Sequence, residues 1–386
     1  MEGIEDRVLM DILSRAVGPE KARVAFEALS QDPSVSIRLN PYKLLSDQKG
    51  LDIVTKVPWS EYGVMLPERP RFVLDPLFHA GCYYVQDSSA MFVGTLFRKV
   101  LPERSGLRVL DLCAAPGGKT TDLAASLRDR FGDGFSLLAN EVMRKRYPVL
   151  RTNVRTWGDP RVGTVCLDPS AFRGEAVLDL IVADVPCSGE GMFRKDEKAV
   201  RDWSLQTVSF CAARTRRILS DIWDALAPGG LLLYSTCTFN HLENDDTVAW
   251  AAASLGADIL DEGDIAPAVR TRHGYALLPG LVPGEGQYAA VLRKHGEPGG
   301  ALQGDPLALF HAERPAEGAD PGYPRHEVDR STALKYLHGD ALSTPDAPLG
   351  LLTLTYEGLP LGPAKNIGTR CNNLYPKESR IRMDIR

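Results

Sequence analysis

Two cysteines lie in polar loops that directly follow predicted strands, a placement that suits a reactive thiol. Cys187 comes three residues after Asp184 in the run I-V-A-D-V-P-C-S-G-E-G-M, which spans 181–192. Cys237 lies in the run L-L-L-Y-S-T-C-T, which spans 231–238. A thiol in a polar loop can act as a nucleophile, whereas an isolated cysteine is more often a small apolar core residue. The loop context therefore favours a chemical role for this pair.

The other cysteines are predicted to be core residues. Their spacing is irregular, the total of seven is odd, and the sequence contains no C-x-x-C. Such a pattern indicates neither a disulfide framework nor a zinc site, so we expect no structural metal. These five residues are Cys82, Cys113, Cys166, Cys211 and Cys371.

A third stretch, Val109–Thr121, reads V-L-D-L-C-A-A-P-G-G-K-T-T. It predicts a buried strand, a turn at Pro116, Gly117 and Gly118, and then the start of a helix at Lys119. Free N–H groups at a helix start, next to glycines without side chains, allow a ligand to lie against the backbone. Neither the P-loop pattern nor G-x-G-x-x-G is present. Taken alone, the stretch predicts a nucleotide-like ligand at the first strand-to-helix turn.

Two acidic residues follow later strands of the same predicted sheet. Glu141 ends the second strand, 23 residues after Gly118, and Asp168 ends the third. An acid about 20 residues beyond a glycine turn binds ribose hydroxyls in dinucleotide folds. Either residue could instead be a helix N-cap or a surface acid, but together with the glycine turn they favour ligand binding.

The three stretches, in this order, resemble motifs I, IV and VI of the RNA cytosine-5 methyltransferases, the NOL1/NOP2/Sun family. The longer runs C-S-G-E-G-M-F-R-K-D at 187–196 and S-T-C-T-F-N-H-L-E-N at 235–244 resemble its bacterial ribosomal-RNA branch, the RsmF-like enzymes. The resemblance implies methyl transfer from S-adenosyl-L-methionine to carbon 5 of a cytosine in RNA, most consistently 16S ribosomal RNA. RNA is then the partner, and a monomer is expected.

The resemblance also implies a role for each motif residue. It assigns the nucleophile to Cys237 and an accessory role in product release to Cys187, whereas DNA cytosine-5 methyltransferases attack with the Pro-Cys of motif IV. Asp184 is placed at the target base, and Lys119 reaches the active site. The residues expected at the cofactor are Ala114, Ala115, Pro116, Gly117, Gly118, Lys119, Glu141, Asp168 and Asp184.

The chemistry explains why a thiol is needed. Carbon 5 of cytosine is a poor nucleophile, and a thiolate added to carbon 6 makes carbon 5 enamine-like. Carbon 5 can then attack an electrophilic methyl group, after which a base removes the carbon-5 proton and the thiol is eliminated. Covalent catalysis of this kind divides one steep barrier into smaller ones.

Three other functions compete with this interpretation. A nicotinamide-dependent oxidoreductase can share such a sheet, but it would lack its G-x-G-x-x-G fingerprint and leave both cysteines unexplained. A non-catalytic RNA-binding assembly factor would not need intact Lys119, Asp184, Cys187 and Cys237. A methyltransferase acting on transfer RNA remains an alternative to one acting on ribosomal RNA.

Alternating strands and helices position these loops. Such βα units predict an α/β fold with a mostly parallel, seven-stranded sheet, in which ligands bind beyond the carboxyl ends of the strands. By resemblance, this sheet is that of a Rossmann-like class I methyltransferase domain. The predicted strands are 107–112, 135–140, 164–167, 179–183, 230–236, 257–261 and 287–293, with helices at 118–128, 143–156 and 204–226.

The chain divides into three predicted domains. Residues 1–75 are expected to form a small α+β module that binds RNA or packs, and 76–294 the methyltransferase domain. Residues 295–386 comprise a Gly- and Pro-rich linker followed by a β-rich segment that resembles the PUA-like RNA-binding tail of RsmF-type proteins. Within the entry to the catalytic domain, Tyr83 and Tyr84 are assigned equally to core packing or to contact with cofactor or base.

Composition limits the remaining possibilities. The 386 residues carry a formal net charge of −5, which argues against indiscriminate nucleic-acid binding, although basic clusters occur at 141–161 and 361–386. No apolar run approaches the roughly 20 residues of a membrane span, and the N-terminus lacks signal-peptide features. The expected location is the cytoplasm.

Overall fold

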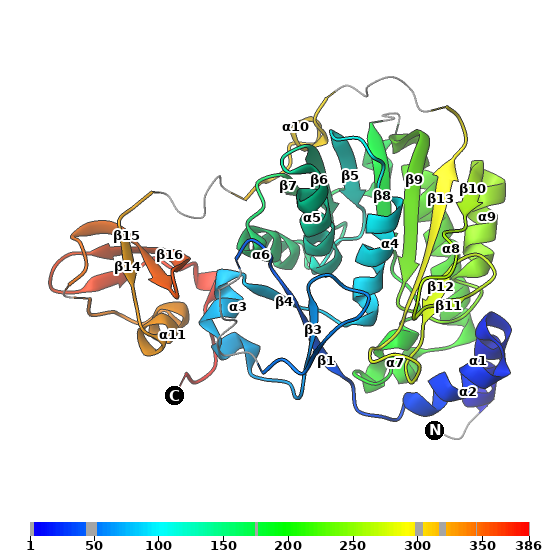
Figure 1. The fold of residues 1–386 in the computed structure, drawn as a ribbon, viewed down its shortest axis with the longest axis horizontal. Helices are drawn as coiled ribbons and strands as arrows, with labels where there is room; N and C mark the ends of the chain where they lie inside the picture. The colour runs from blue at the N-terminus through cyan, green and yellow to red at the C-terminus, as the bar shows by residue number, and fades with distance from the viewer. Residues whose placement is uncertain are drawn as a thin grey trace.

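The computed structural model describes residues 4–43, 52–173, 177–297, 304–315, 322–344 and 346–385. A central nine-stranded sheet has the order β11-β12-β13-β9-β8-β5-β6-β7, and β10 pairs with β13 (Figure 1). The five strands from β9 to β7 are parallel, and the strands beyond β9 are antiparallel. The strands are β5 (Leu107–Asp111), β6 (Phe135–Asn140), β7 (Val162–Val165), β8 (Leu178–Asp184), β9 (Leu226–Thr236), β10 (Ala257–Leu260), β11 (Val269–Arg270), β12 (Tyr275–Leu277) and β13 (Gln287–Lys294).

The predicted fold class is confirmed, and each of the seven predicted strands has a counterpart. The two additional strands, β11 and β12, are two and three residues long. Segments this short contain too few residues to show an apolar alternation, so no pattern in the sequence predicts them. The sheet is therefore larger than predicted, with an antiparallel edge.

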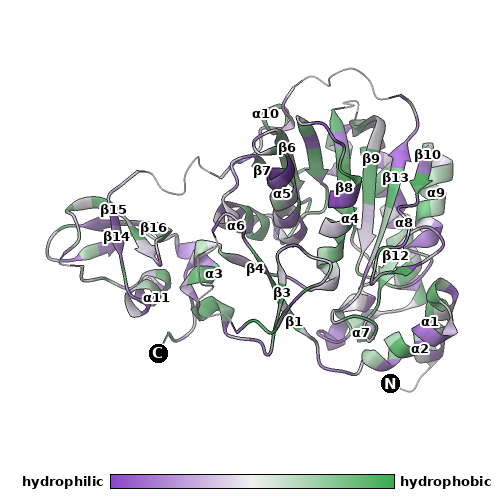
Figure 2. Cartoon of the chain, viewed as in Figure 1, coloured by the Kyte–Doolittle hydropathy of each residue, from purple (hydrophilic) through white to green (hydrophobic). Residues whose placement is uncertain are grey.

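Helices cover both faces of this sheet because successive strand residues point to opposite sides. On β5, Val109 packs under α4, α5 and α6, whereas its neighbour Leu110 packs under α8 and α9. Figure 2 shows β8 as largely hydrophobic, and α5 with both hydrophobic and hydrophilic residues. The covering helices are α4 (Phe92–Val100), α5 (Gly118–Phe131), α6 (Tyr147–Trp157), α8 (Leu205–Ile222) and α9 (Asp245–Leu255).

The N-terminal unit combines two helices with a four-stranded antiparallel sheet of order β2-β3-β1-β4. The strand β4 pairs with β1 but follows residue 75 in the chain, so this sheet extends past the predicted domain boundary. The helical pair packs against the apolar side chains of the two cysteine loops. The elements are α1 (Ile4–Val17), α2 (Pro19–Ala28), β1 (Val35–Leu39), β2 (Thr55–Lys56), β3 (Gly63–Leu66) and β4 (Tyr83–Val85).

The C-terminal unit is a second four-stranded sheet, ordered β14-β15-β16-β17. Its apolar residues share one hydrophobic cluster with the N-terminal sheet, and α3 contacts both β16 and α11 (Figure 1). The two units therefore pack together beside the methyltransferase domain. The elements of the C-terminal unit are α11 (Arg330–His338), β14 (Arg325–Glu327), β15 (Gly350–Tyr356), β16 (Leu359–Asn366) and β17 (Cys371–Asn373), and α3 of the preceding chain spans Pro76–Ala80.

The start of the segment that follows the predicted linker (295–306) is an ordered piece of the catalytic domain, although 295–386 was predicted to be a linker and a β-rich domain. Leu307, in α10 (Pro306–Leu309), is buried in the core beneath α8, and Glu313 exchanges backbone hydrogen bonds with Thr164 of β7. The residues 298–303 lie outside the described residues. The remaining short elements are α7 (Glu197–Asp202) and 3-10 turns at Phe72–Leu74, Ser89–Met91, Pro169–Phe172, Glu190–Met192, Trp223–Ala225 and Lys377–Ser379. Across the described part of the chain, no helix has the length and apolarity to cross a membrane.

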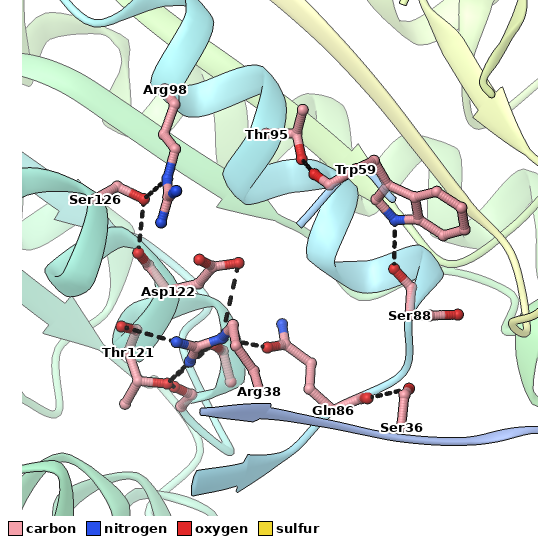
Figure 3. Close-up of polar contacts among 12 residues, drawn as sticks. Ser36, Arg38, Trp59, Gln86, Ser88, Thr95, Arg98, Thr121, Asp122 and Ser126 are labelled. Carbon is pink, nitrogen blue, oxygen red and sulfur yellow. Dashed lines mark hydrogen bonds and ion pairs between the residues drawn. The ribbon is translucent and has the colours of Figure 1, made fainter. Parts of the chain in front are cut away.

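A buried arginine joins the N-terminal sheet to the catalytic domain. Arg38 of β1 is fully buried, and its Nη2 donates to Gly118 O at 3.2 Å and to Thr121 Oγ1 (Figure 3). Its Nε donates to Gln86 Oε1 at 2.8 Å and lies 3.8 Å from Asp122 Oδ2. The guanidinium thus binds the first turn of α5, which carries the glycine turn and Lys119.

Replacing Arg38 with Met is expected to lower the free energy of unfolding by about 3–5 kcal/mol, because Asp122 is left as an unpaired buried acid. Urea unfolding measures this loss. In Arg38→Met/Asp122→Asn, the lone acid is gone, so the double variant is expected to lose less than the two single losses added together. Strictly additive losses would show that the two side chains do not interact.

Candidate active site

The carboxyl ends of β5, β8 and β9 meet at one edge of the sheet, as parallel strands require. Asp111 and Asp184 end β5 and β8, and Asp184 lies in register with Ser235 of β9. Lys119 lies in the first turn of α5 after β5, and the loops after β8 and β9 carry Cys187 and Cys237. Residues from three separate stretches of sequence are therefore brought together.

The two loop cysteines are in contact. The Sγ atoms of Cys187 and Cys237 lie 3.2 Å apart, and both side chains are half-buried. The hydrogen bond with Cys237, burial, and the nearby charge of Glu243 raise the pKa of Cys187 well above its usual value. Cys187 thus holds its proton at neutral pH.

Lys119 and Asp184 form an ion pair beside these thiols. Lys119 Nζ lies 2.9 Å from Asp184 Oδ2. Burial disfavours the charged form of Lys119 and by itself lowers its pKa. The negative charge of Asp184, and that of Cys237 when it is ionised, favour the charged form more strongly, so the pKa of Lys119 is raised. Asp184 Oδ1 accepts hydrogen bonds from Ser235 Oγ at 2.7 Å and Gln287 Nε2 at 3.3 Å. The carboxylate is therefore oriented by three elements.

Two buried glutamates hold the cysteine loops together. The Nδ2 group of Asn240 donates to Glu190 Oε1 at 2.8 Å and to Glu243 Oε1 at 2.9 Å. Glu190 follows Cys187 in its loop and also accepts from Phe239 N at 2.6 Å. Glu243 follows Cys237 and accepts from Ser188 N at 3.0 Å. Each loop thus supplies a carboxylate that binds the other loop, which fixes the separation of the two thiols.

Burial raises the pKa of Glu243 to about 7, against the hydrogen bonds from Ser188 and Asn240. Between pH 4.5 and about 7, the folded chain keeps a proton that the unfolded chain has released, so we expect the free energy of unfolding to fall as pH rises through this window. Above about pH 7 the contribution of Glu243 is lost and the curve flattens.

Urea unfolding of Glu243→Gln across the same pH range tests this expectation, because the amide cannot ionise. We expect a shallower decline than in the wild type, with a residual slope from Asp111, whose pKa burial also raises to about 7. Glu61→Gln changes an exposed carboxylate and serves as the matched control. A Glu243→Gln curve that runs parallel to the wild-type curve would contradict the assignment.

The glycine turn has the open backbone that the sequence predicted. Gly117 has φ of 111° and precedes α5, a conformation that a Cβ would strain. A Cβ on Gly118 would lie 3.0 Å from Tyr84 Cε1. Helix α6 holds the turn in place, since Pro116 O accepts a hydrogen bond from Asn153 Nδ2 at 2.8 Å.

Two carboxylate oxygens near this turn lack partners. Glu141 is buried, and its Oε1 accepts from Met143 N at 2.7 Å. Glu141 Oε2 and Asp111 Oδ1 are buried without a hydrogen-bond partner among the described residues. Arg146 Nη1 lies 3.5 Å from Glu141 Oε2, beyond a good hydrogen bond. Such acceptors suit the hydroxyl and ammonium donors of a nucleoside ligand.

Asp168 lies apart from this buried group. It stands three residues beyond the end of β7, is exposed, and its Oδ1 accepts from Ser170 N at 3.0 Å and Ser170 Oγ at 2.7 Å. These hydrogen bonds lower its pKa. The structure therefore shows Asp168 as a turn cap, the alternative that its sequence position left open, and any cofactor role remains a prediction.

The two tyrosines of the entry segment differ in their surroundings. Tyr83 is buried and donates to Asp75 Oδ2 at 2.6 Å, which is core packing. Tyr84 lies against Gly118, directly behind the glycine turn.

Several site residues were not predicted from the sequence. Asp111, Glu190, Asn240 and Glu243 all lie within the three matched stretches, so a signal existed, but their roles depend on burial and on contacts between loops. Gln287 comes from the antiparallel strand β13, and nothing in its own sequence context pointed to the site.

The sheet order, the glycine turn and the loops at the carboxyl edge together define a Rossmann-like methyltransferase. A model of the 16S rRNA methyltransferase RsmB/F family matches residues 99–293, and models of the RsmF N-terminal domain and the RsmF PUA domain match 13–88 and 323–381. The chain belongs to the 16S rRNA methyltransferase RsmB/F family, which confirms the resemblance to the RsmF-like branch.

Relatives and solved structures agree with this assignment. Proteins named ribosomal RNA small subunit methyltransferase F are 36% identical over 74% of this chain in Cronobacter sakazakii and 31% identical over 78% in Serratia proteamaculans. The matches span 62% and 78% of those proteins. A methyltransferase homologue from Pyrococcus horikoshii superimposes with a TM-score of 0.59 at 26% identity, covering 74% of this chain and 93% of its own. NSun6 from the same organism, solved with SFG, gives 0.61 at 18% identity, covering 75% and 98%.

Replacing Glu141 with Ala is expected to weaken S-adenosylmethionine binding by about 1.5–3 kcal/mol, the value of a hydrogen bond to a charged group. Isothermal titration calorimetry measures the change. Asp133→Ala, at the far end of α5 in an exposed position, is the control and should bind as the wild type does. Unchanged affinity in Glu141→Ala would remove this residue from the cofactor site.

Proposed function

We propose that the protein transfers a methyl group from S-adenosylmethionine to carbon 5 of a cytosine in 16S ribosomal RNA. The observation that carries this proposal is the pair of thiols 3.2 Å apart beside the Lys119–Asp184 ion pair. One thiol serves to attack carbon 6, and the second lies close enough to act on the resulting adduct. Ribosomal RNA is favoured over transfer RNA because the matching family model and the named relatives refer to it.

The cofactor site consists of the glycine turn and the acids around it. The backbone of 114–118 would lie along the ligand, and the free Oε2 of Glu141 would accept from the ribose hydroxyls. We assign Asp168 to the adenine amino group. Bound S-adenosylmethionine would supply an electrophilic methyl group.

We assign the nucleophile to Cys237. The resemblance of S-T-C-T to motif VI supports this assignment, and the Lys119 ammonium supplies positive charge toward Cys237. Attack forms a bond from Cys237 Sγ to carbon 6 and moves the carbon 5–carbon 6 π electrons into the ring. Carbon 5 would take the methyl group with its electron pair, and the sulfonium would leave as the neutral thioether S-adenosylhomocysteine. A base or water then takes the carbon-5 proton, the electron pair of that C–H bond re-forms the carbon 5–carbon 6 double bond, and Cys237 leaves as a thiolate.

Asp184 is assigned to the target base. Its Oδ1 is held by Ser235 and Gln287, and its Oδ2 by Lys119, so the carboxylate has a fixed orientation at the strand end. An ionised carboxylate accepts hydrogen bonds, as the amino group of cytosine would require. Because the side chain is already ordered, RNA binding does not carry the entropic cost of ordering it.

The division of labour between the cysteines gives the sharpest test of the mechanism. Cys237→Ala cannot form the bond to carbon 6, so it is expected to be inactive and to yield no RNA adduct. Cys187→Ala is expected to attack and transfer methyl, then stall as a protein–RNA adduct that survives denaturing electrophoresis. The double variant should show no adduct.

Cys113→Ala is the control, because this cysteine lies in the glycine stretch but outside the thiol pair. An adduct from Cys237→Ala and none from Cys187→Ala would move the nucleophile to Cys187 and leave the fold intact. Tritium transfer from labelled S-adenosylmethionine to 16S RNA or to a transfer-RNA pool separates the two substrates. Absence of transfer to either RNA, and to small ribosomal subunits, would overturn the proposed activity.

A further inference from the structure

A cleft separates helix α6 from the C-terminal unit, and none of the residues assigned to catalysis lines it. It consists of two hollows with volumes of about 470 and 160 Å³. The hollows adjoin, since they share the lining residues His79, Thr152, Thr156, Tyr375 and Ser379.

The larger hollow is mainly basic. Arg151 and Arg155 are one turn apart on α6, and both are exposed. Arg151 Nη1 lies 3.2 Å from Glu313 Oε2, whereas Lys43 Nζ is fixed to the wall by Thr156 O at 2.6 Å. The charged lining residues are Lys43, Arg151, Arg155 and Arg314 against Glu313 and Glu378, and Arg314 Nη2 lies 3.0 Å from Asp305 Oδ2.

The smaller hollow is mainly aromatic. Its volume is close to that of a protein cavity that holds a single benzene ring. Tyr375 enters it from the C-terminal unit and packs on Tyr336, with 5.2 Å between the ring centroids. The aromatic lining residues are Phe78, Tyr83, Tyr84, Trp157 and Tyr375.

The walls of the cleft are held in place by packing on both sides. The C-terminal unit shares a hydrophobic cluster with the N-terminal sheet, and Glu313 pairs its backbone with Thr164 of β7. The cleft also adjoins the glycine turn. Tyr84 lies against Gly118, and Asn153, another lining residue, donates to Pro116 O.

We propose that this cleft binds an unpaired nucleotide of the substrate RNA, with its base in the aromatic hollow and its phosphates on Arg151 and Arg155. The inference rests on the proposed function, because it takes RNA as the substrate. Aromatic faces beside arginines are the combination that recognises splayed-out bases and their backbone. The basic character of the wall stands out on a chain whose net charge is −5.

The phosphate contacts are tested by salt dependence, with fluorescein-labelled oligocytidine as the probe. Each phosphate contact contributes about 0.7 to the slope of log affinity against log salt for single strands. Arg151→Ala/Arg155→Ala is expected to lower the slope by about 1.4. The control is Arg130→Ala/Arg270→Ala, which removes two exposed arginines from the last turn of α5 and from β11 and should leave the slope unchanged.

The base contact is tested by comparing oligocytidine with an abasic strand of equal length. Stacking on one aromatic side chain corresponds to roughly 5- to 100-fold in affinity. We expect the wild type and Tyr375→Phe to prefer oligocytidine by this factor, and Tyr375→Ala to lose the preference. Thermal unfolding of each variant verifies that it is folded.

The outcomes separate this inference from the function on which it rests. The cleft proposal would be overturned if the double arginine variant kept the wild-type salt slope and Tyr375→Ala kept the wild-type preference for oligocytidine over the abasic strand. In that case the protein would still bind RNA, and the proposed function would stand. No salt-dependent binding of any strand by the wild type would overturn the RNA substrate itself.

Discussion

The catalytic edge is the edge of the sheet at which β5, β8 and β9 end. The positions of its two cysteine loops depend on one shared amide, the Nδ2 group of Asn240 between Glu190 and Glu243. Each carboxylate belongs to one cysteine loop and accepts hydrogen bonds from the other, so neither loop can move without breaking buried polar contacts. A buried acceptor left without a donor costs about 1–3 kcal/mol, more when it is charged. The 3.2 Å contact of the two sulfurs is therefore imposed by groups that do not themselves take part in the chemistry.

The N-terminal unit belongs to the same construction. Arg38 donates to the first turn of α5, and α1 and α2 pack on Phe193 and Phe239 beside the cysteine loops. The approach is close, since a Cβ on Gly280 would lie 2.9 Å from Cβ of Ala28. Because Arg38 is fully buried, its charge is compensated only while its acceptors stay in place. The N-terminal unit, which was predicted to bind RNA or to pack, thus also supports the glycine turn.

The sequence predicted the parts of the fold that local chemistry determines. Parallel strands buried on both faces appear as continuous apolar runs, and the glycine turn has a backbone requirement that few residues meet. The strands β11 and β12 are too short for such a signal, and α10 was hidden in a segment whose composition is typical of a linker. Asp168 shows a second limit, because an acid after a strand can equally cap the next turn. The network around Glu243 required knowing which side chains become buried together, which depends on tertiary packing.

Electrostatics gives a physical reason for the proposed separation of RNA-backbone contacts from the cysteine loops. The catalytic edge carries Asp111, Asp184, Glu141, Glu190 and Glu243, a set of acids that would repel a phosphodiester chain if all were ionised and unpaired. Three features reduce that charge: Lys119 pairs with Asp184, and burial raises the pKa values of Asp111 and Glu243 to about 7. The edge can then present carboxylate acceptors to a nucleoside cofactor and a base without a large negative field. Affinity for the RNA backbone must come from elsewhere, and the exposed arginines of α6, which face the C-terminal unit across the cleft, are placed to supply it.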